Sequence, residues 1–358
     1  MKVFSLLLLS ILFITSCDNS EMPADAFLPD ANGQHGDILI LMDDGLWNGI
    51  VGEAVQENLS RRAEGVYLRP EPMFTYFRKH PKDLNHMNQL NRNILKFMVV
   101  SDTVYEETAV LKKRNYYAKG QLFVIVKDSD PNRLYEYAKN GMDEIVEEFN
   151  DFELEQLISY YENEPNKRVK ELAEKKFGIT LSVPKRAEIK SEKENFVLIK
   201  RDRSKNLMGS ESTRAEGGTF WIQQGFMIWS TPYYPDSTQM TVLGALMNRD
   251  STLKQNVPGE VSGTYMGTEY TEYYEPKGRV FNYNGHETVE LRGLWIYEGD
   301  TFVGGGGPFV QYSILNEAKN EIITVSGYVY GPKYEKREYI REIDAVLNTI
   351  VLTDNFSN

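Results

Sequence analysis

The stretch TFWIQQGFMIW, residues 219–229, decides the fold of the second half of the chain. Its side chains alternate between two largely apolar faces of one strand. Phe220, Ile222, Phe226 and Ile228 form one face, and Trp221, Gln223, Met227 and Trp229 form the other. The second face allows two interpretations: a helix covers it, as in a helix-sheet-helix sandwich, or it is an aromatic surface that binds sugar rings or anchors a protein partner.

Further strand and helix patterns surround this stretch. Strands are predicted over 178–184, 194–202, 263–270, 278–283, 287–297, 309–315 and 321–330. The first two of them are expected to form a hairpin. Helical spacing of apolar residues predicts a helix over 238–254 and a last helix over 334–352. The second half is therefore predicted to be an antiparallel sheet with one helix in the middle of the sequence and one at its end.

The first half alternates strands and helices. Strands are predicted over 37–42, 73–80, 94–100 and 121–127. Helices are predicted from Trp47 to Leu59 and, after Asp130 and Pro131, over two stretches that end near Tyr161. This order predicts a second antiparallel sheet with helices on one face.

The length of the chain also favours two domains, because a single hydrophobic core does not usually support as many as 358 residues. The predicted fold class is α+β, with two domains, each an antiparallel sheet packed with helices. The predicted segments are a signal peptide (1–16), a flexible tether (17–36), a first domain (37–161), a charged helical junction (162–176) and a second domain (177–354).

The N-terminus has the pattern of a secretory signal peptide. Lys2 is followed by a short apolar run, which is too short to span a bilayer. The run ends in Ile14-Thr15-Ser16-Cys17, which resembles the lipobox of bacterial lipoproteins. The resemblance implies that Cys17 is acylated, for example with palmitate, and becomes the first residue of the mature chain. Two or more acyl chains would hold it stably on a membrane, with the outer membrane as the expected location.

Composition excludes several classes of function. Cys17 is the only cysteine, so the chain has no intramolecular disulfide and no Cys-ligated metal. The formal net charge of -12 argues against nucleic-acid binding. None of the four histidines lies in an H-E-x-x-H motif, and no cofactor or metal is expected. The Ser182-x-x-Lys185 match contains Pro184 and is interpreted as a strand-end turn. The oligomeric state stays open.

Several short motifs resemble a lipoprotein family of Bacteroidetes that is known only as a domain of unknown function. They are Arg92-Asn93-Ile94-Leu95, Gly293-Leu294-Trp295, Gly307-Pro308-Phe309 and Gly327-Tyr328-Val329-Tyr330 with Pro332. The resemblance covers nearly the whole mature chain and brings no known site residues. The second half is also distantly similar to the PsbP-like fold, an α/β/α sandwich. Proteins of that fold are mostly accessory or binding proteins, which favours binding over catalysis.

The residues predicted to bind a partner or ligand are aromatic or glycine. They are Trp221, Trp229, Tyr265, Tyr273, Trp295, Gly305 and Gly306. The four glycines 304–307 form either a wide loop or bulge, or a loop whose amides bind a ligand.

These residues predict a non-enzymatic, lipid-anchored envelope protein that binds another envelope protein or a polysaccharide. The alternative is an enzyme acting on envelope glycan, with paired carboxylates among Glu269, Glu272 and Glu275 near Tyr273 as acid and base.

Overall fold

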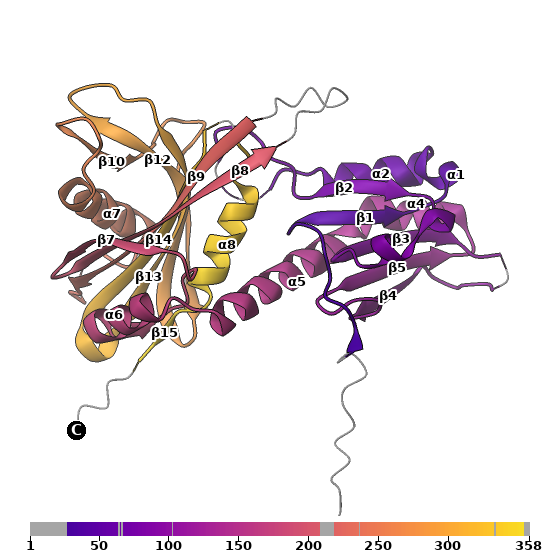
Figure 1. Cartoon of the computed structure of the whole chain (residues 1–358), viewed down its shortest axis with the longest axis horizontal. Helices are drawn as coiled ribbons and strands as arrows, with labels where there is room; N and C mark the ends of the chain where they lie inside the picture. Colours follow the sequence, from indigo (N-terminus) through magenta and orange to yellow (C-terminus); the bar gives the residue numbers. More distant parts are fainter. Residues whose placement is uncertain are drawn as a thin grey trace, which may run out of the picture.

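The computed structural model describes residues 27–353, except 64, 66, 102, 208–217, 236 and 333. Cys17 and the predicted signal peptide lie outside the described residues. The chain forms two lobes, each built on its own sheet: a first lobe (residues 27–163) and a second lobe (residues 167–353) (Figure 1). The α+β fold class with two sheet-based units is confirmed. Among the described residues, no helix is long and apolar enough to cross a membrane.

The sheet of the first lobe has five strands. In spatial order they are β2 (Thr75–Lys79), β1 (Asp37–Leu41), β3 (Asn93–Val99), β5 (Leu122–Asp128) and β4 (Ala109–Arg114). The first four pair in parallel, and only β4 is antiparallel to its neighbour. The antiparallel sheet predicted for this half is therefore wrong. Helical turns lie in the connections from β1 to β2 and from β2 to β3, and β4 returns the chain between β3 and β5, so no hairpin turn joins two parallel strands.

Helices cover one face of this sheet. They are α1 (Asp44–Trp47), α2 (Ile50–Leu59), α4 (Pro131–Asn140) and α5 (Met142–Asn163). A 3-10 turn at Pro81–Asp83 and the short α3 (His86–Gln89) flank Leu84, which packs on the other face of the sheet. The apolar stripes of α2, α4 and α5 pack on the buried side chains of β1, β3 and β5. Asp130 caps α4 through the N–H of Asn132, and Pro131 occupies its first turn, as predicted.

The sheet of the second lobe is antiparallel throughout, as predicted. Its order is β10 (Thr264–Thr268), β12 (His286–Gly299), β13 (Gly306–Asn316), β14 (Glu321–Tyr330), β9 (Gly218–Pro232), β8 (Phe196–Leu207) and β7 (Glu188–Lys193), with β11 (Lys277–Tyr283) also paired to β12. The predicted hairpin of 178–184 with 194–202 is wrong. β8 pairs with β7, whereas β6 (Ile179–Thr180) pairs with β15 (Val351–Leu352).

Helices cover both faces of this second sheet. Phe226 and Ile228 of β9 pack with α8 (Arg337–Leu347) and α6 (Lys167–Phe177). Met227 and Trp229 pack under α7 (Val242–Asn256) on the opposite face. Figure 1 shows α7 and α8 on the two sides of the sheet. Of the two interpretations of the second face of β9, the helix-covered one holds over most of the strand.

The predicted tether is wrong for its described part. Asp30 bridges to Lys119, and Asn32 bridges to Asn91, which ties the segment to the first lobe. The ring of His35 is hydrogen-bonded to the carboxylate of Glu153, whose side chain is fully buried in α5. Residues 27–36 are thus an extension of the folded lobe, because hydrogen bonds hold their backbone.

Candidate functional site

A carboxylate of the first lobe caps a helix of the second. Glu71 accepts hydrogen bonds from the backbone N–H of Lys336, at 2.9 Å to each carboxylate oxygen, and from that of Arg337 at 2.7 Å. These N–H groups belong to the first turn of α8, where no side chain of α8 itself acts as a cap. A negative charge is favourable there because the helix dipole is positive at this end. The contact joins the two lobes.

Two arginines of α8 reinforce this junction. Arg337 donates to the carbonyl of Pro72 at 2.5 Å, and Arg341 donates to the carbonyl of Met73 at 2.8 Å. Both bonds hold the loop that connects α2 to β2 against the second lobe. The same loop inserts Tyr67 into the core beneath α8. These contacts anchor the loop to the second lobe at Tyr67 and at residues 71–73.

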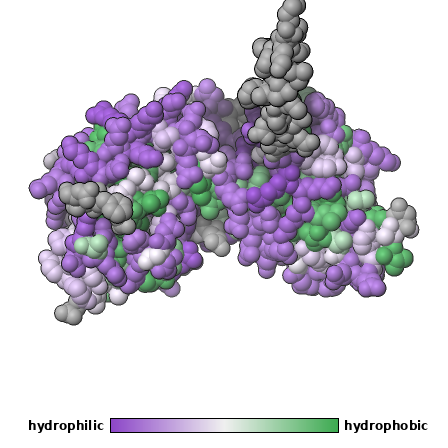
Figure 2. Space-filling model, turned by 90° about the horizontal axis from the view of Figure 1, so that it is seen from below, coloured by the Kyte–Doolittle hydropathy of each residue, from purple (hydrophilic) through white to green (hydrophobic). Residues whose placement is uncertain are grey.

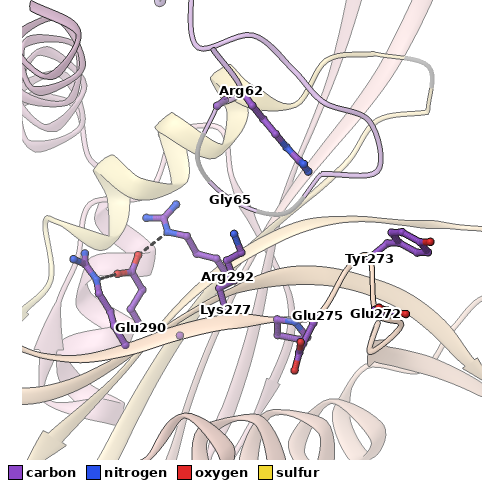
Figure 3. Close-up of a pocket in the computed structure, with 12 residues that line it drawn as sticks. Arg62, Gly65, Glu272, Tyr273, Glu275, Lys277, Glu290 and Arg292 are labelled. Carbon is purple, nitrogen blue, oxygen red and sulfur yellow. Dashed lines mark hydrogen bonds and ion pairs between the residues drawn. The ribbon is translucent and has the colours of Figure 1, made fainter. Parts of the chain in front are cut away.

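The space between the lobes contains a cleft of about 740 Å³, which we call the interlobe cleft. Its size lies within the usual range of ligand sites. One wall is the α2–β2 loop, and the other is the 269–276 loop with β11 and β12 (Figure 3). The lining residues are Arg62, Ala63, Gly65, Glu272, Tyr273, Glu275, Pro276, Lys277, Gly278, Arg279, Glu290 and Arg292.

At one end of the cleft, charges are already paired. The Glu290 carboxylate lies between two guanidinium groups, those of Arg279 and Arg292 (Figure 3). Arg292 also donates to Asp344 of α8 at 2.7 Å. Burial disfavours the charged form of Arg292, but Asp344 and Glu290 outweigh this effect and raise its pKa. Arg292 therefore stays protonated and serves as a fixed charge rather than as a proton donor.

Other cations of the cleft have no such partner. Arg62 and Lys277 form no ion pair with any described residue, and they reach into the cleft from opposite walls (Figure 3). The side chain of Arg279 is 68% exposed, and only its Nε is bonded to Glu290. At the other end, Glu272 and Glu275 are exposed beside Tyr273, which is 86% exposed. The cleft thus has a cationic end and an acidic, aromatic mouth.

A second hollow of about 450 Å³ adjoins the cleft along the same seam between the lobes. Ala63, Arg279 and Arg292 line both hollows. Residues of α5 and α8 form its far side, among them Leu154 and Ile340. The face in Figure 2 shows hydrophobic residues only in small, separate patches on a mainly hydrophilic surface. Both hollows along the seam are lined by charged side chains together with apolar ones.

The structure separates the predicted binding residues. Tyr273 lines the cleft together with Glu272 and Glu275, but Glu269 does not, and its carboxylate accepts from the N–H of Thr271. Trp229 and Trp295 are each 1% exposed, so their assignment to a binding surface is corrected. They are core residues because α7 covers Trp229, and neighbouring tyrosine rings enclose Trp295.

The remaining predicted residues do not line the cleft. Trp221 is 69% exposed, and Tyr265 donates to Glu298 at 3.1 Å. A Cβ on Gly305 would lie 3.0 Å from the ring of Tyr297, and a Cβ on Gly306 would lie 2.5 Å from the carbonyl oxygen of Trp295. The glycine run is thus explained by the close approach of two strands, and it does not line the interlobe cleft.

Sequence reasoning missed the cations of the cleft. Arg62, Lys277, Arg279 and Arg292 lie in segments that look like ordinary charged surface. No motif links them, because more than 200 positions separate Arg62 from Lys277. The described residues contain no group of three or more acidic or histidine side chains that could hold a metal ion.

One further charged residue was missed in the core. Arg249 of α7 is fully buried and donates to Gln311 at 3.2 Å and to Ser326 at 2.8 Å. Its guanidinium carbon lies 3.5 Å from the ring centroid of Phe309. Burial lowers the pKa of Arg249 to about 9, because no carboxylate contacts it directly among the described residues. No cleft reaches it, so we assign it to the core.

The comparisons with known proteins agree with a chain in two parts. A domain of unknown function (DUF8532) matches residues 31–162, and a domain of unknown function (DUF4837) matches residues 166–349. No curated protein matches the chain.

Two solved structures resemble part of the chain at low similarity. The Ran-binding protein Mog1p of Saccharomyces cerevisiae is 10% identical with a TM-score of 0.31, over 49% of this chain and 91% of Mog1p. Cyanobacterial PsbP (CyanoP) from Synechocystis sp. PCC 6803 is 7% identical with a TM-score of 0.24, over 46% of this chain and 92% of that protein. The family match is the stronger finding, since it extends over about half of the chain. The chain belongs to the family described as a domain of unknown function, DUF4837.

Proposed function

We propose that this protein is a bacterial lipoprotein that binds a polar ligand of the cell envelope in the interlobe cleft. The lipid-modified residue is Cys17, at the end of the lipobox-like sequence Ile14-Thr15-Ser16-Cys17. The proposed location is the outer membrane. The acyl chains hold the N-terminus at the membrane, and the folded lobes present the cleft to the ligand.

The observation that carries the binding role is the cleft itself. It lies between two lobes that Glu71, Arg337 and Arg341 hold together. It contains Arg62 and Lys277, which form no ion pair with the rest of the described chain. A concave space of this size with a few charged groups in its wall is a candidate ligand site, because such groups orient a bound ligand.

A second candidate is an enzyme acting on envelope glycan. It is favoured by one observation: Glu272 and Glu275 line the same cleft beside Tyr273. Binding is the better supported of the two, because both carboxylates are exposed to solvent. A general acid needs burial or a neighbouring charge to raise its pKa.

Two measurements test the proposal. Palmitate-analogue labelling and membrane fractionation should detect the wild type in the membrane and leave Cys17→Ser unlabelled. For the cleft, Glu275→Cys in the Cys17→Ser background provides one thiol for an environment-sensitive fluorophore, with exposed Lys319→Cys as the control.

We expect envelope polysaccharide to change the fluorescence at position 275 and not at position 319. Equal signals at both positions, or no change with any envelope fraction, would refute the binding role. Release of shortened glycan by the wild type, abolished in Glu272→Gln, would instead establish the enzyme.

A further inference from the structure

We infer that the ligand is a glycan that carries an anionic group, and that Arg62 and Lys277 bind this group. The inference rests on the proposed binding role of the interlobe cleft and adds the chemical class of the ligand. It starts from the distribution of charge within the cleft rather than from the charge of the chain as a whole.

Charges in the cleft fall into a paired set and an unpaired set. Glu290, 4% exposed, is neutralised by Arg279 and Arg292, and Arg292 is further engaged by Asp344. Arg62 and Lys277 have no counter-charge among the described residues, and the terminal nitrogens of Arg279 are bonded to none of them. The cationic end therefore has spare donors, which a carboxylate or sulfate of the ligand would satisfy.

The mouth of the cleft suits a sugar ring. Tyr273 offers an exposed aromatic face next to Glu272 and Glu275. Sugar rings stack on aromatic faces through their C–H groups, and carboxylate oxygens accept hydrogen bonds from hydroxyl groups. A ligand that bears only anionic groups would be repelled by these two carboxylates. An acidic glycan with hydroxyl groups fits both ends.

The neighbouring hollow indicates an oligosaccharide rather than a single sugar. Arg279 and Arg292 line both hollows, so a chain that fills the first continues into the second past these two side chains. Nucleic acid, the other common polyanion, is disfavoured by the net charge of -12. The N-terminus of α8 offers no phosphate site because Glu71 occupies it.

The test uses defined oligosaccharides and the lipidated chain in detergent. Calorimetric titration compares tetragalacturonate, which is carboxylated, with a sulfated chondroitin tetrasaccharide and with neutral mannotetraose. The variants are Arg62→Gln with Lys277→Gln, and the control is Arg69→Gln, which removes an exposed arginine from the same loop without touching the cleft. Thermal melts establish that all proteins are equally folded.

We expect an acidic tetrasaccharide to bind at least about tenfold more tightly than mannotetraose, since one charged hydrogen bond is worth about 1.4 kcal/mol or more. The double variant should abolish this preference, Arg69→Gln should keep it, and added salt should weaken it. Preference for the carboxylated or for the sulfated probe identifies the anionic group.

Equal binding of all three probes, unchanged in the double variant, would overturn the anionic ligand while leaving the cleft as a glycan site. Binding of none of them, with a fluorescence response at position 275 to another envelope fraction, would refute a glycan ligand. No response to any fraction would refute the binding role too.

Discussion

Replacement of Glu71 by alanine should loosen the junction of the two lobes. The substitution removes the acceptor for the N–H groups of Lys336 and Arg337, which lie 2.7 to 2.9 Å from its carboxylate. Both N–H groups stand in the first turn of α8, and Arg337 is only 4% exposed. Water therefore has little access to replace the lost acceptor, and at least one N–H group stays unsatisfied.

The expected size of the effect follows from these contacts. An unsatisfied buried donor costs about 1–3 kcal/mol, and the loss of an N-terminal cap costs about 1 kcal/mol. Together they predict a loss of about 2–4 kcal/mol for Glu71→Ala. Glu71→Gln keeps one acceptor oxygen and should lose about 1 kcal/mol. In a chain of 358 residues, a destabilisation of this size lowers the melting temperature by roughly 3–5 °C.

The assay is differential scanning calorimetry of the full chain, with Glu335→Ala as the matched control. Glu335 is exposed and lies just before the start of α8. It forms no hydrogen bond between the lobes with any described residue. It should change stability by less than about 0.5 kcal/mol. If Glu71→Ala and Glu335→Ala have the same melting temperature, the cap does not join the lobes and the reasoning is wrong.

Three other predictions concern packing and charge in the second lobe. Gly306→Ala should cost about 1–3 kcal/mol, since its Cβ would lie 2.5 Å from a backbone oxygen, whereas Gly304→Ala, with nothing within 4 Å, should melt like the wild type. Arg249→Lys should lower the denaturation midpoint more than Arg249→Met, because lysine buries the same charge with fewer hydrogen bonds; the reverse order would contradict this. Burial raises the pKa of Tyr283 and Tyr339 to about 12, so their contribution to stability should be present below pH ~10 and lost as the pH rises towards 12. Circular dichroism should show alkaline unfolding at a higher pH for the Tyr283→Phe, Tyr339→Phe variant than for the wild type, and an unchanged unfolding pH would refute the burial argument.

The sequence alone predicted most strands and helices of the second lobe. Alternation along 219–229 assigned its two faces correctly, because in a strand successive side chains must point to opposite sides. The helical spacing of apolar residues also predicted α7 and α8. What alternation could not decide was whether the second face was covered, since Trp229 packs against a helix that is separate in sequence.

The relative direction of the strands in the first sheet was predicted wrongly. The runs ILIL in β1 and LFVIV in β5 are continuously apolar, which is typical of parallel strands buried on both faces. The strand β4, AVLKKR, was missed because only its first half is apolar. Pairing direction depends on the path of the connections, which no single strand encodes.

The lipid-anchor signal at Cys17 is a local motif, so the sequence by itself determines that prediction without reference to the fold. The cleft is the opposite case. Arg62 and Lys277 face each other only because Glu71 and two arginines of α8 dock one lobe on the other. Local propensity acts over a few residues, whereas this site needs contacts between segments more than 200 positions apart. The tertiary structure therefore decided where the charges of the chain meet.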